Sequence, residues 1–147
     1  MKMKRVLCAA VIALAAAETF GATYYVAPAG KNTNKGTKDS PFATLNKANS
    51  VVNAGDTVWI RGGTYLHTDT NYVKNDNMFA GIHLTKSGSS DNKRIHYLAY
   101  PGEKPVIDFS KMPIADGSNN IRYTSGILIQ AQYLHLKGLE VKNVPMK

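Results

Sequence analysis

Three short segments occur twice, in the same order, in the second half of the chain, and this repeat limits the fold more than any other feature. The first set is Gly81-Ile82-His83-Leu84, Arg94-Ile95-His96-Tyr97 and Val106-Ile107-Asp108; the second is Gly126-Ile127-Leu128-Ile129, Tyr133-Leu134-His135-Leu136 and Leu139-Glu140-Val141. A unit that repeats in fixed order along a chain is typical of a solenoid, because each unit buries its apolar face against the next one.

The repeated segments predict strands rather than helices. Their apolar residues alternate with polar ones over three to five residues, which is the period of a strand. Strands this short bury too little as an ordinary hairpin, but they form a core of Ile, Leu and Val when each stacks in register on the next coil. The sequence therefore predicts a parallel β-helix of about three coils, with residues 110–125 as an inserted loop.

One helix is expected, near the N-terminal side of the repeat. Residues 41–53 carry apolar side chains at helical spacing, with Thr44 as a candidate N-cap and Gly55 as a candidate C′ residue. A strand is expected before the helix at 23–27 and another after it at 56–60, ended by Gly62-Gly63. We expect the helix to cover the open end of the stack and shield its unpaired backbone.

The first residues predict a secretory signal peptide. Lys2, Lys4 and Arg5 precede an apolar run over residues 6–17, which is too short for a membrane-spanning helix of about 20 residues. We expect cleavage after Ala17, or as late as residue 22, which leaves 18–147 as the cap and first coils of the β-helix. The only cysteine, Cys8, lies in the predicted signal, so the secreted chain has no internal disulfide.

The charge of the chain argues against a nucleic-acid partner. The net charge is +8, and loss of the three basic residues of the signal lowers it to +5. After the signal only Lys93 and Arg94 are adjacent cations, so no basic patch is expected. With no second apolar stretch of membrane length, the sequence favours a secreted, extracellular or periplasmic protein with a weak attraction to acidic polysaccharide.

Metal-binding residues are sparse in the sequence. Asp69 and Asp76, with Asn71, Asn75 and Asn77, form the nearest approach to an oxygen-rich cluster, and a solvated loop is the favoured interpretation. His83, His96 and His135 each lie between two apolar or aromatic neighbours, so alternation points them to the outer face, at most as an exposed ladder. His67 is expected in a loop.

Sugar-binding residues are suggested by the aromatic side chains. Trp59, Tyr65, Tyr72 and Tyr97 are candidates for stacking on sugar rings; for Trp59, packing beneath the helix or a long loop is the favoured alternative. Lys137 and Lys142 are placed to meet an acidic glycan, although solvated surface lysines are the commoner case.

Four spaced segments then resemble a known family. They are Tyr24-Tyr25-Val26-Ala27-Pro28-Ala29-Gly30, Lys35-Gly36-Thr37, Pro41-Phe42-Ala43-Thr44-Leu45 and Ala54-Gly55-Asp56-Thr57-Val58-Trp59-Ile60-Arg61-Gly62-Gly63-Thr64-Tyr65. In this order they resemble the N-terminal cap and first coil of secreted right-handed parallel β-helix proteins, especially pectate lyases of polysaccharide lyase family nine. Residues 99–108 and 133–143 continue the resemblance.

The resemblance implies a secreted polysaccharide lyase that acts by β-elimination on acidic plant polysaccharide such as pectate. In those lyases a lysine base and a calcium cluster of aspartates lie on later coils, and no residue here matches them. We therefore assign no catalytic, cofactor-binding or metal-ligating residue; calcium is expected only for a full-length family member. Because the chain stops at Lys147, just after a strand, we expect an N-terminal part of a longer protein, truncated at its C-terminus and inactive alone. A non-catalytic glycan-binding or surface β-helix module is the alternative.

Overall fold

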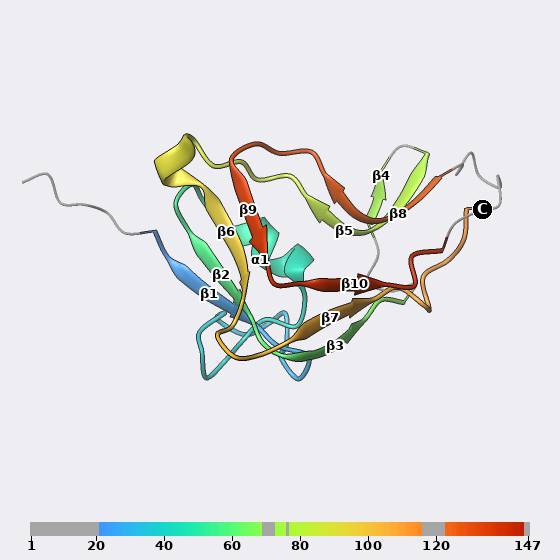
Figure 1. The fold of residues 1–147 in the computed structure, drawn as a ribbon, viewed down its shortest axis with the longest axis horizontal. Coiled ribbons are helices and arrows are strands. Elements are labelled where there is room, and N and C mark those ends of the chain that lie inside the picture. Colours follow the sequence, from blue (N-terminus) through green and yellow to red (C-terminus); the bar gives the residue numbers. More distant parts are fainter. Residues whose placement is uncertain (1–20, 69–72, 76, 116–122, 146–147) are drawn as a thin grey trace, which may run out of the picture.

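The chain folds into three β-sheets wrapped around one core, which is the architecture of a parallel β-helix (Figure 1). The computed structural model describes residues 21–68, 73–75, 77–115 and 123–145. The predicted signal peptide at 1–17, with Cys8, lies outside the described residues. Seen as in Figure 1, the α-helix α1 (Leu45–Val51) lies inside the outline that the three sheets draw.

Each sheet collects strands that lie far apart in the sequence. The first sheet holds β1 (Thr23–Val26), β2 (Thr57–Ile60), β6 (Ile95–Ala99) and β9 (Leu134–Lys137), all parallel. The second holds β3 (Gly63–Leu66), β7 (Pro105–Asp108) and β10 (Glu140–Lys142), also parallel. The third pairs β5 (Met78–Leu84) with β8 (Tyr123–Ile129) in parallel and adds β4 (Val73–Asn75) in an antiparallel hairpin with β5.

The strand register confirms the repeat seen in the sequence. Ile82 lies beside Ile127, and His96 lies beside His135, so each repeated segment stacks on its counterpart in the next coil. The last segment is the exception, because Glu140 lies beside Val106. The predicted pairing of Leu139 with Val106 was therefore wrong by one residue.

Strand alternation fills the core between the sheets. The inward residues Val58, Ile60, Ile95, Tyr97 and Ile107 are all completely buried. The residues between them along each strand are half-buried or exposed on the outside. Stacking like residues on like in consecutive coils lets a strand of four residues contribute to one continuous interior.

The helix α1 (Leu45–Val51) is shorter than predicted. Thr44 is the N-cap as expected, because its Oγ1 accepts a hydrogen bond from the Lys47 N–H at 3.1 Å. The C-cap is Val52 in extended conformation, so the prediction of Gly55 as C′ residue was wrong. Gly55, at a φ of 92°, lies instead in the turn that leads into β2.

The pair Gly62-Gly63 does more than end β2. Gly63 is the first residue of β3, so the chain turns a corner there and immediately forms a strand that the sequence analysis did not predict. At this corner Gly63 has a φ of 115°, a conformation that side chains disfavour. The double glycine ends β2, as predicted, and also forms a corner of the coil at which β3 begins.

Side chains of α1 cover the edge of β5 in place of another strand. Asn46 donates to the Gly81 carbonyl and accepts from the His83 N–H, both at 2.9 Å. Asn49 accepts from the N–H groups of Thr85 and Lys86 at 3.1 and 3.2 Å. The predicted role of the helix, to shield backbone at the open end of the stack, is confirmed.

Candidate functional site

The outer face of the first sheet brings aromatic, cationic and imidazole side chains together. Register places these outward residues in two parallel columns: Thr23, Thr57, His96 and His135 in one, and Tyr25, Trp59, Leu98 and Lys137 in the other. Their neighbours within each strand point into the core. We call this surface the outer face.

Aromatic rings gather at one side of the outer face. The Trp59 and Tyr100 rings meet edge to face with centroids 5.9 Å apart, and Tyr25 lies 6.2 Å from Tyr100. Trp59 is half-buried and lies between the fully buried Val58 and Ile60, so it points outward. Its ring contacts Tyr100 on the outer face, the side on which the sugar-stacking interpretation places it.

Two cations lie over the Tyr100 ring. The Arg61 guanidinium carbon is 4.8 Å from the ring centroid and the Lys38 ammonium is 5.5 Å from it. Both distances are in the range of cation–π attraction. The hydrogen bond to Tyr100 raises the pKa of Lys38, so this ammonium stays charged at neutral pH.

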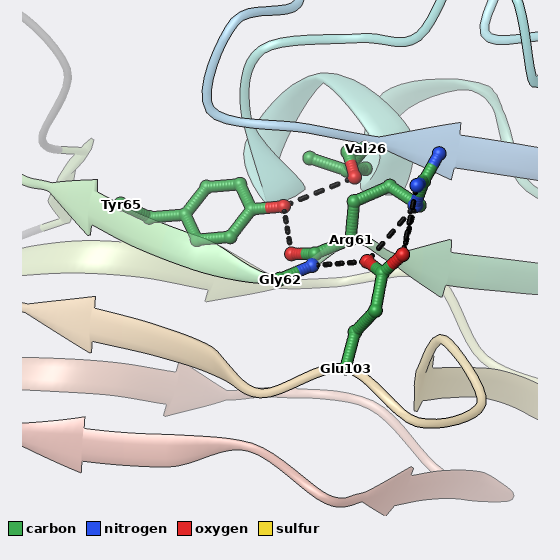
Figure 2. A network of polar contacts seen from close by, with 5 residues as sticks. All are labelled: Val26, Arg61, Gly62, Tyr65 and Glu103. Carbon is green, nitrogen blue, oxygen red and sulfur yellow. Dashed lines mark hydrogen bonds and ion pairs between the residues drawn. The ribbon is translucent and has the colours of Figure 1, made fainter.

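Arg61 is held by Glu103 from the next coil (Figure 2). Its Nε lies 2.9 Å from Oε2 and its Nη2 lies 2.7 Å from Oε1, which is a bidentate pair. The Glu103 carboxylate also accepts from the Gly62 N–H at 2.6 Å, and the Arg61 guanidinium and this N–H lower the pKa of Glu103. The pair fixes where the cation lies on the outer face.

A hollow adjoins this ion pair. It measures about 560 Å³ and is lined by residues of the loop after β1 and of the β2–β3 corner, together with Glu103; these are Ala27, Pro28, Ala29, Arg61, Gly62, Gly63 and Thr64. The Gly62 N–H donates to the Glu103 carboxylate and the Gly63 N–H donates to the Lys104 carbonyl. The hollow is open to solvent, with one charged pair at its rim.

Two predicted sugar-stacking residues are buried instead. Tyr65 is 6% exposed, and its hydroxyl donates to the carbonyls of Val26 and Arg61 within the network of Figure 2. Tyr97 is completely buried, and burial raises the pKa of both phenols. Those two predictions were wrong because both residues have inward parity, and Tyr72 lies outside the described residues.

The three strand histidines lie on the outside, as alternation predicted. His96 and His135 stack on consecutive coils, with their Nδ1 atoms 3.1 Å apart. His83 belongs to the third sheet, where its Nε2 meets Gln130 Oε1 at 2.7 Å. Burial, followed by the neighbouring His135 and Arg94, lowers the pKa of His96. The predicted ladder therefore consists of two histidines, on the first sheet.

His67 is not in an exposed loop. It directly follows β3, is only 4% exposed, and its ring lies 4.7 Å from the Phe109 ring. Its Nδ1 is buried without a hydrogen-bond partner, and burial lowers its pKa to about 4. His67 lies outside any helix or strand, as predicted, but its burial was not foreseen because β3, the strand before it, went unrecognised.

The described carboxylates do not fit a calcium site. Asp108 accepts from the Ser110 N–H and the Asn143 amide, and Asp56 accepts from the N–H groups of Ala22 and Asn53. The hydrogen bonds from Asn143 and Ser110, followed by the charge of Lys142, lower the pKa of Asp108 to about 2. Among the residues that the structure describes, no three His, Cys, Asp or Glu side chains converge. Asp69 and Asp76 lie outside them.

The two predicted glycan-facing lysines differ in their surroundings. Lys142 lies 3.6 Å from Asp108 Oδ2, so much of its charge is offset. Lys137 is exposed at the end of the Trp59 column of the outer face. Only Lys137 therefore extends the cationic character of that face.

Similarity to known proteins accounts for this architecture. Residues 24–147 match the family model described as Pel9A-like, right handed beta helix region. The chain belongs to this family. Membership in the Pel9A-like family confirms the predicted right-handed parallel β-helix and the resemblance to pectate lyases. In the part of the chain that the structure describes, no helix is long and apolar enough to span a bilayer.

Relatives of the Pel9A-like chain include several pectate lyases. Pectate lyase PEL9 of Emericella nidulans is 34% identical over 92 residues, covering 63% of this chain and 20% of that protein. Pectate lyase L of Paenibacillus polymyxa is 36% identical over 118 residues, covering 80% and 22%. The chain thus spans about a fifth of the length of these curated relatives.

Two solved structures of lyases are similar to the Pel9A-like chain. A structure titled rhamnogalacturonan lyase superposes with a TM-score of 0.68 at 36% identity, covering 82% of this chain and 28% of that one. Pectate lyase Pel9A superposes with a TM-score of 0.57 at 25% identity, covering 80% and 27%.

Sequence reasoning missed Tyr100 as the neighbour of Trp59, and missed the charged groups around Tyr100, which are Lys38, Arg61 and its partner Glu103. A usable signal was present, because stacking Ile60 on Ala99 in consecutive coils also places Arg61 next to Tyr100. Recognising the pairing of β2 with β6 from the pattern alone would have found this cluster.

Proposed function

We propose that this chain forms the N-terminal cap and first coils of a secreted pectate-lyase-like protein that degrades acidic plant polysaccharide by β-elimination. The observation that carries the proposal is the match of residues 24–147 to the Pel9A-like family, joined by pectate lyases among the relatives. The predicted signal peptide supports secretion. Because the chain spans about a fifth of those relatives, the proposal divides the protein into a capping part and a catalytic part.

The chemistry explains this division. β-Elimination on a uronate needs a base that removes the proton next to the carboxylate, and a positive charge that stabilises the electrons left behind. Three described cations form ion pairs with carboxylates: Arg61 with Glu103, Arg94 with Asp91, and Lys142 with Asp108. We therefore place the base, and the calcium ligands of the family, on residues other than those described, and assign this segment a positioning and binding role.

A second candidate function is a glycan-binding β-helix module without catalysis. It is favoured by the outer face, where Trp59 and Tyr25 offer apolar ring surface beside the charged Lys38 and Lys137. Aromatic rings pack on sugar faces, and ammonium groups attract uronate carboxylates. In this reading the chain contributes affinity for an acidic polymer and no bond is broken.

The activity of the chain is tested on polygalacturonate, by the ultraviolet absorbance of the unsaturated product, with and without added calcium. We expect no product from the chain alone. A chimera that continues this chain with the later coils of Pectate lyase L of Paenibacillus polymyxa should form product. The same later coils without any cap are the control. Turnover by the chain alone, or no turnover by a folded chimera, would contradict the proposal.

Binding separates the two candidates. Affinity electrophoresis in gels containing polygalacturonate should retard the protein, and Trp59→Ala should reduce the retardation severalfold. The matched control is Tyr123→Ala, which removes a 57% exposed aromatic from the third sheet. Retardation with an inactive chimera favours the binding module. Equal retardation of both variants and the parent protein rules out the outer face as the binding surface.

A further inference from the structure

We propose that His96 and His135 form a binding site for one divalent transition-metal ion on the outer face of the first sheet. The two residues come from consecutive coils and are partners in the strand register. The inference is independent of the proposed function, because it uses only the geometry of these two imidazoles.

The backbone holds the two histidines together. β6 and β9 pair in parallel, and the Ile95 N–H donates to the Tyr133 carbonyl at 3.0 Å next to the pair. Ile95 and Tyr97, on either side of His96, are completely buried, so His96 cannot turn inward without removing both from the core. The approach of the two rings is therefore a property of the coil, not of two freely moving surface side chains.

The distance between the ring nitrogens fits a shared ion. The two Nδ1 atoms are 3.1 Å apart, and the ring centroids are 5.3 Å apart with the planes at 71°. Two nitrogens each bound at about 2.1 Å to one ion, at an angle of about 95°, are about 3.1 Å apart. The ion therefore needs little movement of the side chains to replace the hydrogen bond between the rings.

Binding requires a change of tautomer and no change of charge. In the metal-free pair one Nδ1 carries the proton of the hydrogen bond and the other accepts it. With the metal bound, both Nδ1 atoms are ligands and both rings carry their proton on Nε2. Water fills the remaining coordination positions. The next outward residue of the same column, Thr57, is polar and small and leaves room for that water.

The surroundings select the kind of ion. The charged groups near the pair are cations. Arg94 lies near enough to lower the pKa of His96, although its guanidinium is paired with Asp91. Lys137 lies on the same face. Among the described residues, no Asp or Glu side chain converges with the two imidazoles, so calcium and magnesium, which need several oxygens, are disfavoured. Imidazole nitrogens favour Cu²⁺, Ni²⁺ and Zn²⁺, in the order set by the Irving–Williams series.

The test is a calorimetric titration of purified protein that carries no polyhistidine tag, with Cu²⁺, Ni²⁺, Zn²⁺ and Ca²⁺ in separate runs. We expect one bound ion per chain, tightest for Cu²⁺, and no heat from Ca²⁺. The Cu²⁺ complex should show hyperfine splitting from two histidine nitrogens in its paramagnetic resonance spectrum. Absence of saturable binding for all three transition metals overturns the proposal.

Single variants assign the site. His96→Gln and His135→Gln should each weaken Cu²⁺ and Zn²⁺ at least tenfold, while His83→Gln, an outward histidine of another sheet, should leave them unchanged. Melting curves without metal establish that each variant is folded, as expected for outward residues. Binding that persists in both His96→Gln and His135→Gln would show another site and refute this one. A loss of polygalacturonate activity or binding would not bear on it.

Discussion

His67 should make the protein lose stability as the pH falls from 6.5 toward 4, a range that begins well above the ordinary pKa of carboxylates. The side chain is 4% exposed, stacks on Phe109, and has a buried Nδ1 without a partner. Burial lowers its pKa to about 4 from an ordinary value of 6.5. Between these values the unfolded chain binds a proton that the folded chain does not, so this contribution to stability is lost as the pH falls from 6.5 to 4.

The size of the effect follows from the two pKa values. One unit of pKa corresponds to about 1.4 kcal/mol, so the full separation is worth about 3 kcal/mol. By pH 4.5 the folded state should have lost about 2.5 kcal/mol of this relative to neutral pH. For a small domain with a total stability of 5–15 kcal/mol, this is a large fraction.

His67→Phe isolates the contribution. Phenylalanine keeps a flat ring against Phe109 and cannot titrate, and no hydrogen bond of Nδ1 is lost because none exists. Urea unfolding, followed through the fluorescence of Trp59, the single tryptophan, gives the free energy of unfolding between pH 7.5 and 4.5. We expect the variant to match the parent within about 1 kcal/mol at pH 7.5 and to exceed it by about 2 kcal/mol at pH 4.5.

Other groups also titrate over this interval, so only the difference between variants is decisive. His83→Gln serves as the control, because it removes a histidine from the outside of the third sheet and leaves the buried His67 in place. If His67→Phe and the parent lose stability in parallel from pH 7.5 to 4.5, the argument that burial keeps His67 neutral is refuted.

Three further results are expected. Gly36→Ala should destabilise the protein by at least about 2 kcal/mol more than Gly102→Ala in thermal melts, because both glycines have a φ near 77° but only a Cβ at position 36 would overlap a buried ring, that of Phe42. Equal losses would contradict this. Asn49→Ala should cost about 2–4 kcal/mol by leaving two backbone N–H groups without their acceptor, whereas Ser50→Ala on the exposed side of α1 should cost under about 1 kcal/mol. Secreted protein should begin at Glu18 by intact mass, and retention of residues 1–17 would refute the predicted signal peptide.

Most of the fold could be predicted from the sequence because similar side chains stack on each other in consecutive coils. His96 and His135 each follow a position that faces the core, so their register and their outward direction both follow from the repeat. The same parity would have corrected the last segment. Val141 lies beside the fully buried Ile107, whereas the predicted alignment placed Glu140 there.

The candidate site was harder to predict because its contacts run between coils at corners. Arg61 and Glu103 lie 42 residues apart, each next to a turn, where strand alternation gives no direction. The burial of His67 was missed for a related reason: β3, the strand before it, begins at a glycine with positive φ, and a glycine pair suggests a turn more strongly than four residues suggest a strand.

The way in which α1 ends the stack explains why a helix can stand where a strand would otherwise be. A strand edge offers alternating N–H and C=O groups, and a helix has already used its own backbone groups internally. Only a side chain with both a donor and an acceptor can replace the missing peptide group. Asn46 does so, because its amide donates to the Gly81 carbonyl and accepts from the His83 N–H. Asn49, three residues further and so on the same side of the helix, continues along the edge to Thr85 and Lys86. The amide side chains of α1 therefore make the helix a hydrogen-bonded first layer of the third sheet, and apolar burial alone would have left that edge open to a second chain.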